Sequence, residues 1–182
     1  MQTGEEYYRR YLAGQTEAFD ELIRLYRGGL TFFIQRIVGD PHTAEDLAAD
    51  VFVQLLVYPR RYDFRCSLKT YLYMLGRSRA LDYLRRLNRF RFDPLPEDYP
   101  ADRTLEEQFL VDQRRRAVHR ALGQLPRLQR QALHLVYFEN LTYREAAVVL
   151  KKKPKQVDNL LYHGRQALKE LLKDDMAWMY NL

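Results

Sequence analysis

Residues 142–161 read TYREAAVVLKKKPKQVDNLL, and they hold the most telling local signals in the chain. Thr142 and Glu145 have the spacing of a capping box, in which each side chain accepts a hydrogen bond from the other's backbone N–H. After three lysines, Pro154 suits the first turn of another helix, where the missing N–H is not needed. The stretch therefore predicts two helices joined by a short turn.

Small and apolar side chains predict how these two helices pack. Ala147 lies ten residues before Val157 and would let the helices approach closely, which is the spacing of a helix-turn-helix. The turn position that often holds glycine is Lys151, where a left-handed backbone would cost about 1 kcal/mol or more. We expect these side chains to face inward: Ala146, Ala147, Leu150, Val157, Leu161, Gly164, Leu168, Leu171 and Leu172.

The opposite face of the second helix carries side chains that suit duplex DNA. Gln and Asn can bind adenine edges, Lys can reach guanine, and Arg can bind phosphate. The residues concerned are Lys155, Gln156, Asn159, Tyr162, His163 and Arg165. A structural helical hairpin with a polar outer face is the alternative. The cap, the turn spacing and the flanking lysines together favour DNA binding.

Nearly every ordered stretch of the chain has helical periodicity and none alternates like a strand, so the chain is predicted to be all-α. An apolar stripe over 19–37 ends at Gly39-Asp40-Pro41, and Thr43 is expected to cap a helix that buries Leu47, Val51, Leu55 and Tyr58. A long helix is expected from Ser67, with Leu68, Leu72, Ala80, Leu84 and Leu87 inward. The second body is expected to start in a helix near Arg103 or Gln113 and to include Val118, Leu122 and Leu125.

Charge and proline divide the chain into two small helical domains. We expect domains over residues 1–92 and 113–182, joined by an acidic linker over 93–112 that contains three prolines and seven acidic residues. Residues 60–92 carry ten basic and two acidic side chains, and residues 113–182 carry fourteen basic and six acidic ones. Two basic bodies separated by an acidic segment indicate two polyanion-binding surfaces.

The long helix of the first domain carries basic side chains interleaved with an aromatic one. Lys69, Tyr73 and Arg77 are expected on the face opposite Leu68 and Leu72, and Arg85 extends it. Tyr62, Phe64 and Arg65 lie in the basic loop just before. Cations can meet phosphates while rings stack on unpaired bases, so this set favours a single strand. The alternative is that the aromatic residues belong to the core and the arginines only solubilise the surface.

The two bodies together resemble a bacterial RNA polymerase sigma factor of the extracytoplasmic-function group, in the sigma-70 family. The resemblance runs from about residue 5 to residue 173 and rests on segments in the family's order. They are AEDL at 44–47 with DVF at 50–52, then FR at 64–65, LKTYL at 68–72 and ALDYLRR at 80–86, then LP at 125–126, QR at 129–130 and YFENLTYREAA at 137–147.

The resemblance implies a role for each surface. Asp46, Asp50 and Gln54 would bind the clamp helices of the polymerase β′ subunit, while the C-terminal domain would meet the β flap. The loop with Phe64 and Arg65, and the helix with Lys69, Tyr73, Arg77 and Arg85, would bind and open the −10 promoter element. Lys155, Gln156, Asn159, Tyr162, His163 and Arg165 would read the −35 element. An anti-sigma factor is a candidate partner. Three positions depart from the family's pattern: Ala49, Tyr71, for which we expect a core role, and Ser78.

Other classes of function lack their signals in the sequence. The four histidines have no paired-ligand spacing, and no phosphate loop or nucleophile motif is present, so we expect no enzyme, metal or cofactor. We expect Cys66 to be a plain small side chain rather than a redox switch. No apolar run reaches the roughly 20 residues that span a bilayer, so we expect a cytoplasmic protein without membrane insertion. Two alternatives stay open: a stand-alone helix-turn-helix regulator that binds operator DNA without polymerase, and a nuclease using Asp63 and Asp82.

Overall fold

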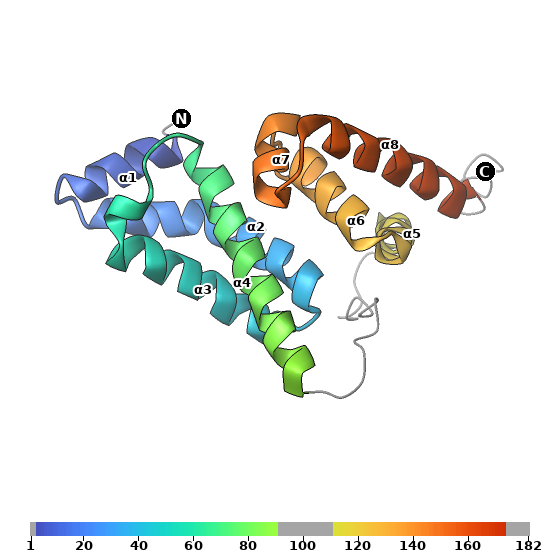
Figure 1. Cartoon of the computed structure of the whole chain (residues 1–182), viewed down its shortest axis with the longest axis horizontal. Coiled ribbons are helices and arrows are strands. Elements are labelled where there is room, and N and C mark those ends of the chain that lie inside the picture. Colours follow the sequence, from blue (N-terminus) through green and yellow to red (C-terminus); the bar gives the residue numbers. More distant parts are fainter. Residues whose placement is uncertain (1–2, 91–110, 174–182) are drawn as a thin grey trace.

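The computed structural model describes residues 3–90 and 111–173, and the side chains of 3–88 and 117–173 within them. These parts form helices in two groups (Figure 1). The first group comprises α1 (Gly4–Leu12), α2 (Glu17–Val38), α3 (Pro41–Val57), the short turn η1 (Pro59–Arg61) and α4 (Leu68–Phe90). The second comprises α5 (Val111–Gln124), α6 (Arg127–Leu133), the π-helical turn η2 (His134–Phe138), α7 (Tyr143–Leu150) and α8 (Pro154–Leu171). The all-α prediction is confirmed.

The first group packs α1, α3 and α4 around α2, which contributes Leu22, Leu30, Phe33 and Ile34 to the core. Gly39 ends α2 in the left-handed conformation, as its place after the apolar stripe predicts. Thr43 does not cap α3, so that prediction is wrong. Asp40 does, because Pro41 takes the first helical position and the Asp40 carboxylate then accepts from the Thr43 N–H at 2.6 Å.

The second group confirms the helix-turn-helix. Thr142 and Glu145 form the predicted capping box, with the Thr142 N–H donating to Glu145 Oε2 at 2.9 Å. Pro154 begins α8, and Lys151 is left-handed with φ 54°. A Cβ on Gly164 would lie 3.0 Å from the Leu133 side chain, so glycine lets α8 lie close to α6.

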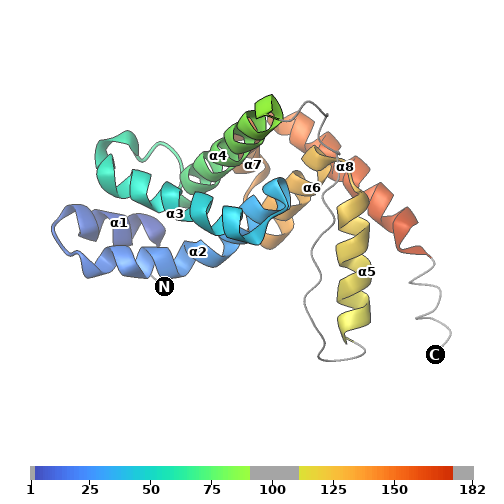
Figure 2. The same cartoon turned by 90° about the horizontal axis from the view of Figure 1, so that it is seen from below.

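Two side chains predicted to face inward are exposed instead: Tyr58 and Leu171. Tyr58 follows the last turn of α3, where the chain leaves the helix, and its ring lies under the Arg61 guanidinium. Leu171 is the last residue of α8, and that end of the helix extends away from the first group of helices (Figure 2).

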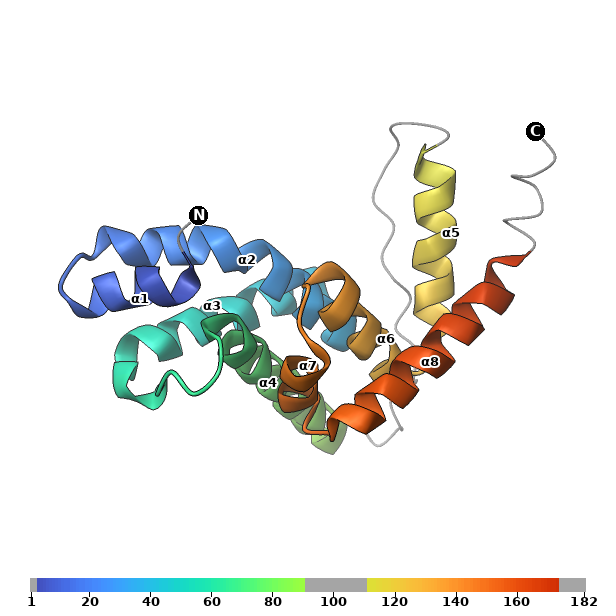
Figure 3. The same cartoon turned by 90° about the horizontal axis from the view of Figure 1, so that it is seen from above.

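The two groups pack against each other. α4 lies against α7, and α2 lies against α6 (Figure 3). Most of the predicted linker, residues 93–110, lies outside the described residues, so the boundaries at 92 and 113 stay predictions. In the described parts of the chain, no helix is both long and apolar enough to cross a bilayer.

Candidate nucleic-acid and polymerase interfaces

Among the residues that the structure describes, the outer face of α8 is exposed. All six residues predicted to read duplex DNA are exposed: Lys155, Gln156, Asn159, Tyr162, His163 and Arg165. Val157 and Leu161 on the opposite face are fully buried and hold the helix on the core. The Arg165 guanidinium donates to the Tyr137 hydroxyl at 3.1 Å, which ties the outer face of α8 to η2. The core thus holds a polar helix face toward the solvent.

The outer face of α3 joins acidic and apolar side chains. Asp46 and Asp50 are exposed, and one and two turns further on Val53 and Val57 are each 56% exposed. The Arg79 guanidinium of α4 contacts Asp50 Oδ2 at 3.1 Å and Gln54 Oε1 at 2.7 Å. Two of the three predicted polymerase-binding side chains are thus held by their own domain. The exposed valines were missed by the sequence reasoning, although they lie off the buried stripe of Val51 and Leu55.

The predicted strand-binding face of α4 is covered by the second group of helices. Tyr73 is fully buried, so the expectation of an exposed Tyr73 is wrong for this arrangement. Its ring packs against Phe33 with centroids 5.2 Å apart. Lys69 and Arg77 are half-buried, whereas Arg85 is exposed and pairs with Asp82 at 2.6 Å. Only the distal part of the predicted face is open.

Glu139 is the centre of this contact. Its carboxylate lies 3.0 Å from Lys69 Nζ and 3.3 Å from His134 Nε2, and its backbone carbonyl accepts from Lys69 Nζ at 2.6 Å. Burial opposes its charge, but the polar groups that face it, on His134, Tyr73 and Lys69, outweigh that and lower the pKa of Glu139 to about 2. Burial and the same carboxylate raise the pKa of Tyr73. Glu139 is therefore ionised and Tyr73 neutral.

Two further polar contacts join the groups. The hydroxyls of Ser67 and Thr70, at the start of α4, donate to Glu145 Oε1 at 2.9 and 3.3 Å. Arg77 Nε donates to Gln131 Oε1 at 2.9 Å. The Glu145 carboxylate thus takes part in the cap of α7 and also contacts the N-terminal turn of α4.

The loop before α4 keeps Phe64 and Arg65 at the surface. Phe64 is 37% exposed and has φ 61°, a conformation that is unusual for a bulky residue. Its ring lies 4.6 Å from that of Tyr62 and 5.0 Å from the Arg9 guanidinium. Tyr62 and Tyr71 are buried, so the core alternative holds for Tyr62, and the core role expected for Tyr71 is confirmed. Burial raises the pKa of the Cys66 thiol, which opposes redox reactivity.

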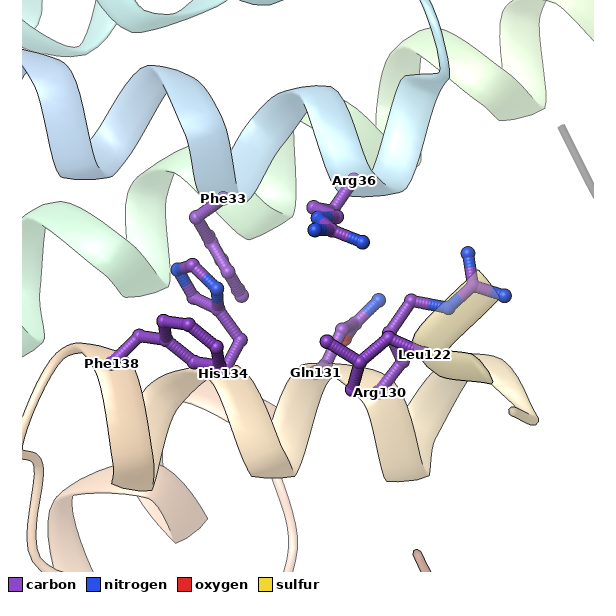
Figure 4. A pocket seen from close by; sticks show the side chains of 7 residues that line it. All are labelled: Phe33, Arg36, Leu122, Arg130, Gln131, His134 and Phe138. Atoms are coloured by element: carbon purple, nitrogen blue, oxygen red, sulfur yellow. The ribbon is translucent and has the colours of Figure 1, made fainter. Parts of the chain in front are cut away.

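Between α2 and α6 the packing leaves only a small cavity of about 10 Å³. It is lined from both groups by Phe33, Arg36, Leu122, Arg130, Gln131, His134 and Phe138 (Figure 4). The His134 ring stacks between Phe33 and Phe138, with centroids 5.5 and 5.4 Å away. A space of this size holds at most a water molecule, so it is no ligand site. In the described residues, no group of His, Cys, Asp or Glu side chains could hold a metal ion.

Comparison with known sequences decides the family. The profile of Sigma-70 region 2 matches residues 22–90, which hold α3 and α4, and that of Sigma-70 region 4 matches residues 115–168, which hold the helix-turn-helix. The chain belongs to the sigma-70 family. Within it, the relatives include sigma factors of the extracytoplasmic-function group. Sigma factors are in general non-catalytic regulators of transcription. Regions 2 and 4 in this order support a sigma factor that directs RNA polymerase to specific promoters.

Two of these relatives are mycobacterial. The chain is 32% identical to the ECF RNA polymerase sigma factor SigE of Mycolicibacterium smegmatis over 159 residues, which cover 85% of this chain and 62% of that protein. It is 28% identical to the ECF RNA polymerase sigma factor SigK of Mycobacterium sp. strain JLS over 170 residues, which cover 90% of this chain and 88% of that one.

Solved structures share the fold. The sigma factor RpoE from Bartonella quintana, crystallised with the anti-sigma factor NepR, has a TM-score of 0.65 at 21% identity, over 85% of this chain and 96% of that one. CnrH, in complex with the cytosolic domain of CnrY, has a TM-score of 0.66 at 21% identity, over 93% and 96%.

Proposed function

We propose that this sigma factor binds core RNA polymerase and places it on promoters through three surfaces of its own. They are the outer face of α3, the face of α4 with its preceding loop, and the outer face of α8. The observation that carries the proposal is the exposed polar face of α8 on a capped helix-turn-helix, in a chain whose other body carries the sigma region 2 sequence.

α8 is the proposed reader of the −35 element as duplex DNA. Gln156 and Asn159 lie one turn apart near its N-terminus and offer amide groups to base edges in the major groove. Lys155 can reach guanine, and Arg165 lies one turn or more further along, where it suits phosphate. Tyr162 and His163 complete the exposed face.

α3 is the proposed polymerase contact, on the β′ clamp helices. An exposed helix face that joins carboxylates to two valines offers charge complementarity to a basic partner and apolar area to bury. Asp46 and Asp50 supply the charge, Gln54 supplies an amide, and Val53 and Val57 supply the apolar area. A partner cation can also compete with Arg79 for Asp50.

α4 and its loop are the proposed −10 site. Phe64 offers a partly exposed ring in an unusual backbone conformation, as binding sites often do, and Arg65 is almost fully exposed beside it. Lys69, Arg77 and Arg85 follow along one helix and can bind successive strand phosphates. Tyr73 packs on Phe33 of α2, so it supports this face from the core rather than contacting the strand.

The remaining partners follow from the family. The C-terminal domain would meet the polymerase β flap, the acidic linker would thread through the enzyme, and an anti-sigma factor is a candidate regulator because RpoE of Bartonella quintana binds one. Polymerase supplies the chemistry, so the chain itself needs neither a catalytic group nor a cofactor.

The test compares DNA binding with and without sigma-free core polymerase. We expect the labelled chain to bind core polymerase tightly, and specific duplex binding to appear only in the joint complex. Tight, specific duplex binding by a dimer of the chain alone, with no affinity for core polymerase, would point instead to a stand-alone regulator.

A further inference from the structure

The N-terminal helix α1 contacts both ends of the segment that leads from α3 into α4 (Figure 1). At the end of α3, the Tyr8 hydroxyl lies 3.2 Å from the carbonyl oxygens of both Leu55 and Pro59. At the start of α4, the Leu68 N–H donates to Glu5 Oε1 at 2.6 Å. These contacts join residues 47 to 63 positions apart, so α1 links the end of one helix to the start of the next.

Glu5 completes the cap of α4. The Ser67 hydroxyl accepts from the Thr70 N–H at 3.2 Å, but the Leu68 N–H, at the first helical position, needs an acceptor of its own. Glu5 supplies this acceptor from another helix, and its negative charge is favourable at the N-terminus of α4. The start of α4 is therefore fixed both by its own residue and by α1.

α1 is itself held firmly on the rest of the first group. A Cβ on Gly4 would overlap the Tyr26 ring, so glycine lets this end of α1 pack directly on α2. One turn later Tyr8 is fully buried, and its ring lies against that of Tyr62 with centroids 5.7 Å apart. Glu5 and Arg9, next to these two anchors, therefore extend from a fixed helix.

Arg9 contacts the ring that is proposed to meet the strand. Its guanidinium carbon lies 5.0 Å from the centroid of Phe64, within the range of a cation–π interaction. The Tyr62 hydroxyl donates to the Cys66 carbonyl at 2.8 Å and closes the loop around Phe64, whose backbone is left-handed. Arg9 and Tyr62 thus hold a ring that remains 37% exposed.

We infer that α1 is a positioning element of the −10 site, in which Glu5 fixes the start of α4 and Arg9 orients the Phe64 ring for a base of the opened strand. The inference rests on the proposed function, because it concerns the same loop. A ring and a helix start that are already in place lose less conformational freedom when the strand binds. Glu5 and Arg9 therefore act through Leu68 and Phe64 rather than on the strand itself.

The experiment uses holoenzyme assembled from core polymerase and full-length chains. The DNA is a promoter selected by the wild-type holoenzyme from a randomised library, with 2-aminopurine in place of one base of its −10 element. The fluorescence of 2-aminopurine rises when the base unstacks, so it reports the rate of strand opening. The affinity of each chain for core polymerase is measured in parallel.

Arg9 gives the first route. We expect Arg9→Gln to slow opening about fivefold, because the cation over the Phe64 ring is lost. Arg9→Lys should recover most of the wild-type rate, since an ammonium can also lie over the ring. Arg24→Gln is the matched control, because it makes the same charge change on the exposed side of α2, where Arg24 pairs with Glu21.

Glu5 gives a second, independent route. In Glu5→Ala the Leu68 N–H loses its acceptor, whereas in Glu5→Gln an amide oxygen can still accept. We expect opening to slow about tenfold in Glu5→Ala and clearly less in Glu5→Gln. Affinity for core polymerase should stay at the wild-type value in every variant, because the proposed polymerase contact lies on α3.

Wild-type opening rates in folded Arg9→Gln and Glu5→Ala would overturn the inference. So would Arg9→Lys that is as slow as Arg9→Gln, or losses of polymerase affinity as large as the losses of opening, which would mean that α1 only stabilises the domain. Arg9 is exposed, so its variants decide alone if Glu5→Ala does not fold. A wild-type chain that neither binds core polymerase nor opens DNA would contradict the proposed function instead, so the two failures are distinguishable.

Discussion

Lys151 ends α7 in the left-handed conformation, with φ 54° and ψ 49°. Its N–H still donates to the Val148 carbonyl at 3.2 Å, so the turn is well formed and the cost lies in the crowded Cβ. We expect Lys151→Gly to raise the free energy of unfolding by about 1 kcal/mol. Lys151→Ala is the control: it removes the same charge but keeps the Cβ, so it should give little gain. Equal free energies of unfolding for Lys151→Gly and Lys151→Ala in urea melts would show that the left-handed Lys151 backbone is not strained.

The pKa of Glu139 predicts a pH dependence. Because the folded value of about 2 lies below the ordinary 4.5, its ionised form stabilises the fold above pH 4.5, and this contribution is lost as pH falls toward 2. Lys69, Tyr73 and His134, which face it, carry no carboxyl group. The stability difference between wild type and Glu139→Gln should therefore shrink across this range. A difference that stays constant in melts from pH 5 to pH 2 would contradict the assignment.

Individual residues divide into those that local rules predict and those that distant contacts decide. The capping box of Thr142 follows from spacing alone and is confirmed, and Lys151 at the turn is left-handed. The burial of Tyr73 could not be predicted from local spacing, because its partners Phe33 and Glu139 lie 40 and 66 residues away in sequence. Thr43 was misassigned because Asp40 before a proline is a better cap for the same helix.

At the scale of elements, α8 should carry the −35 specificity. We expect Asn159→Ala to relax the preference at one base pair and to cost about 1–3 kcal/mol of binding to the preferred sequence, because a side-chain amide read there is lost. A quantitative scan of promoter variants with the polymerase complex checks this. Equal losses on every sequence would mean that Asn159 contacts only the backbone.

The outer face of α3 should carry polymerase affinity. We expect Asp46→Arg to weaken binding to core polymerase at least tenfold while the helical circular dichroism is unchanged, because a rim charge is reversed on an exposed face. Asp46 is a cleaner probe than Asp50, which also pairs with Arg79. Glu21→Arg on α2 is the control for charge reversal. Unchanged affinity for Asp46→Arg would remove this assignment of α3.

Helices with a strong apolar stripe were predicted from the sequence, whereas α1 was missed. The prediction began at Phe19, although Thr3 and Glu6 form a second capping box and Tyr8 is fully buried against Tyr62. The signal was present in the spacing of Thr3 and Glu6. This capping signal was missed because α1 has few aliphatic residues. Its aromatic and charged side chains do not form a recognisable apolar stripe.

At the scale of the whole molecule, the contact between the two groups of helices could not be predicted from the sequence. Composition and order predict two helical domains, but a linker of this kind permits both compact and open arrangements. The contact depends on pairs such as Lys69 with Glu139 and Arg77 with Gln131, which no local pattern relates. The contact between the two groups is therefore known from the structure, whereas the family is known from the sequence.

The most direct test of the central claim is run-off transcription by sigma-free core polymerase on a library of randomised promoters, with and without the chain. We predict defined start sites that appear only when the chain is added, and selected promoters that share two short elements upstream of the start. Transcription that is the same without the chain, or that starts without any shared upstream sequence, would contradict the account.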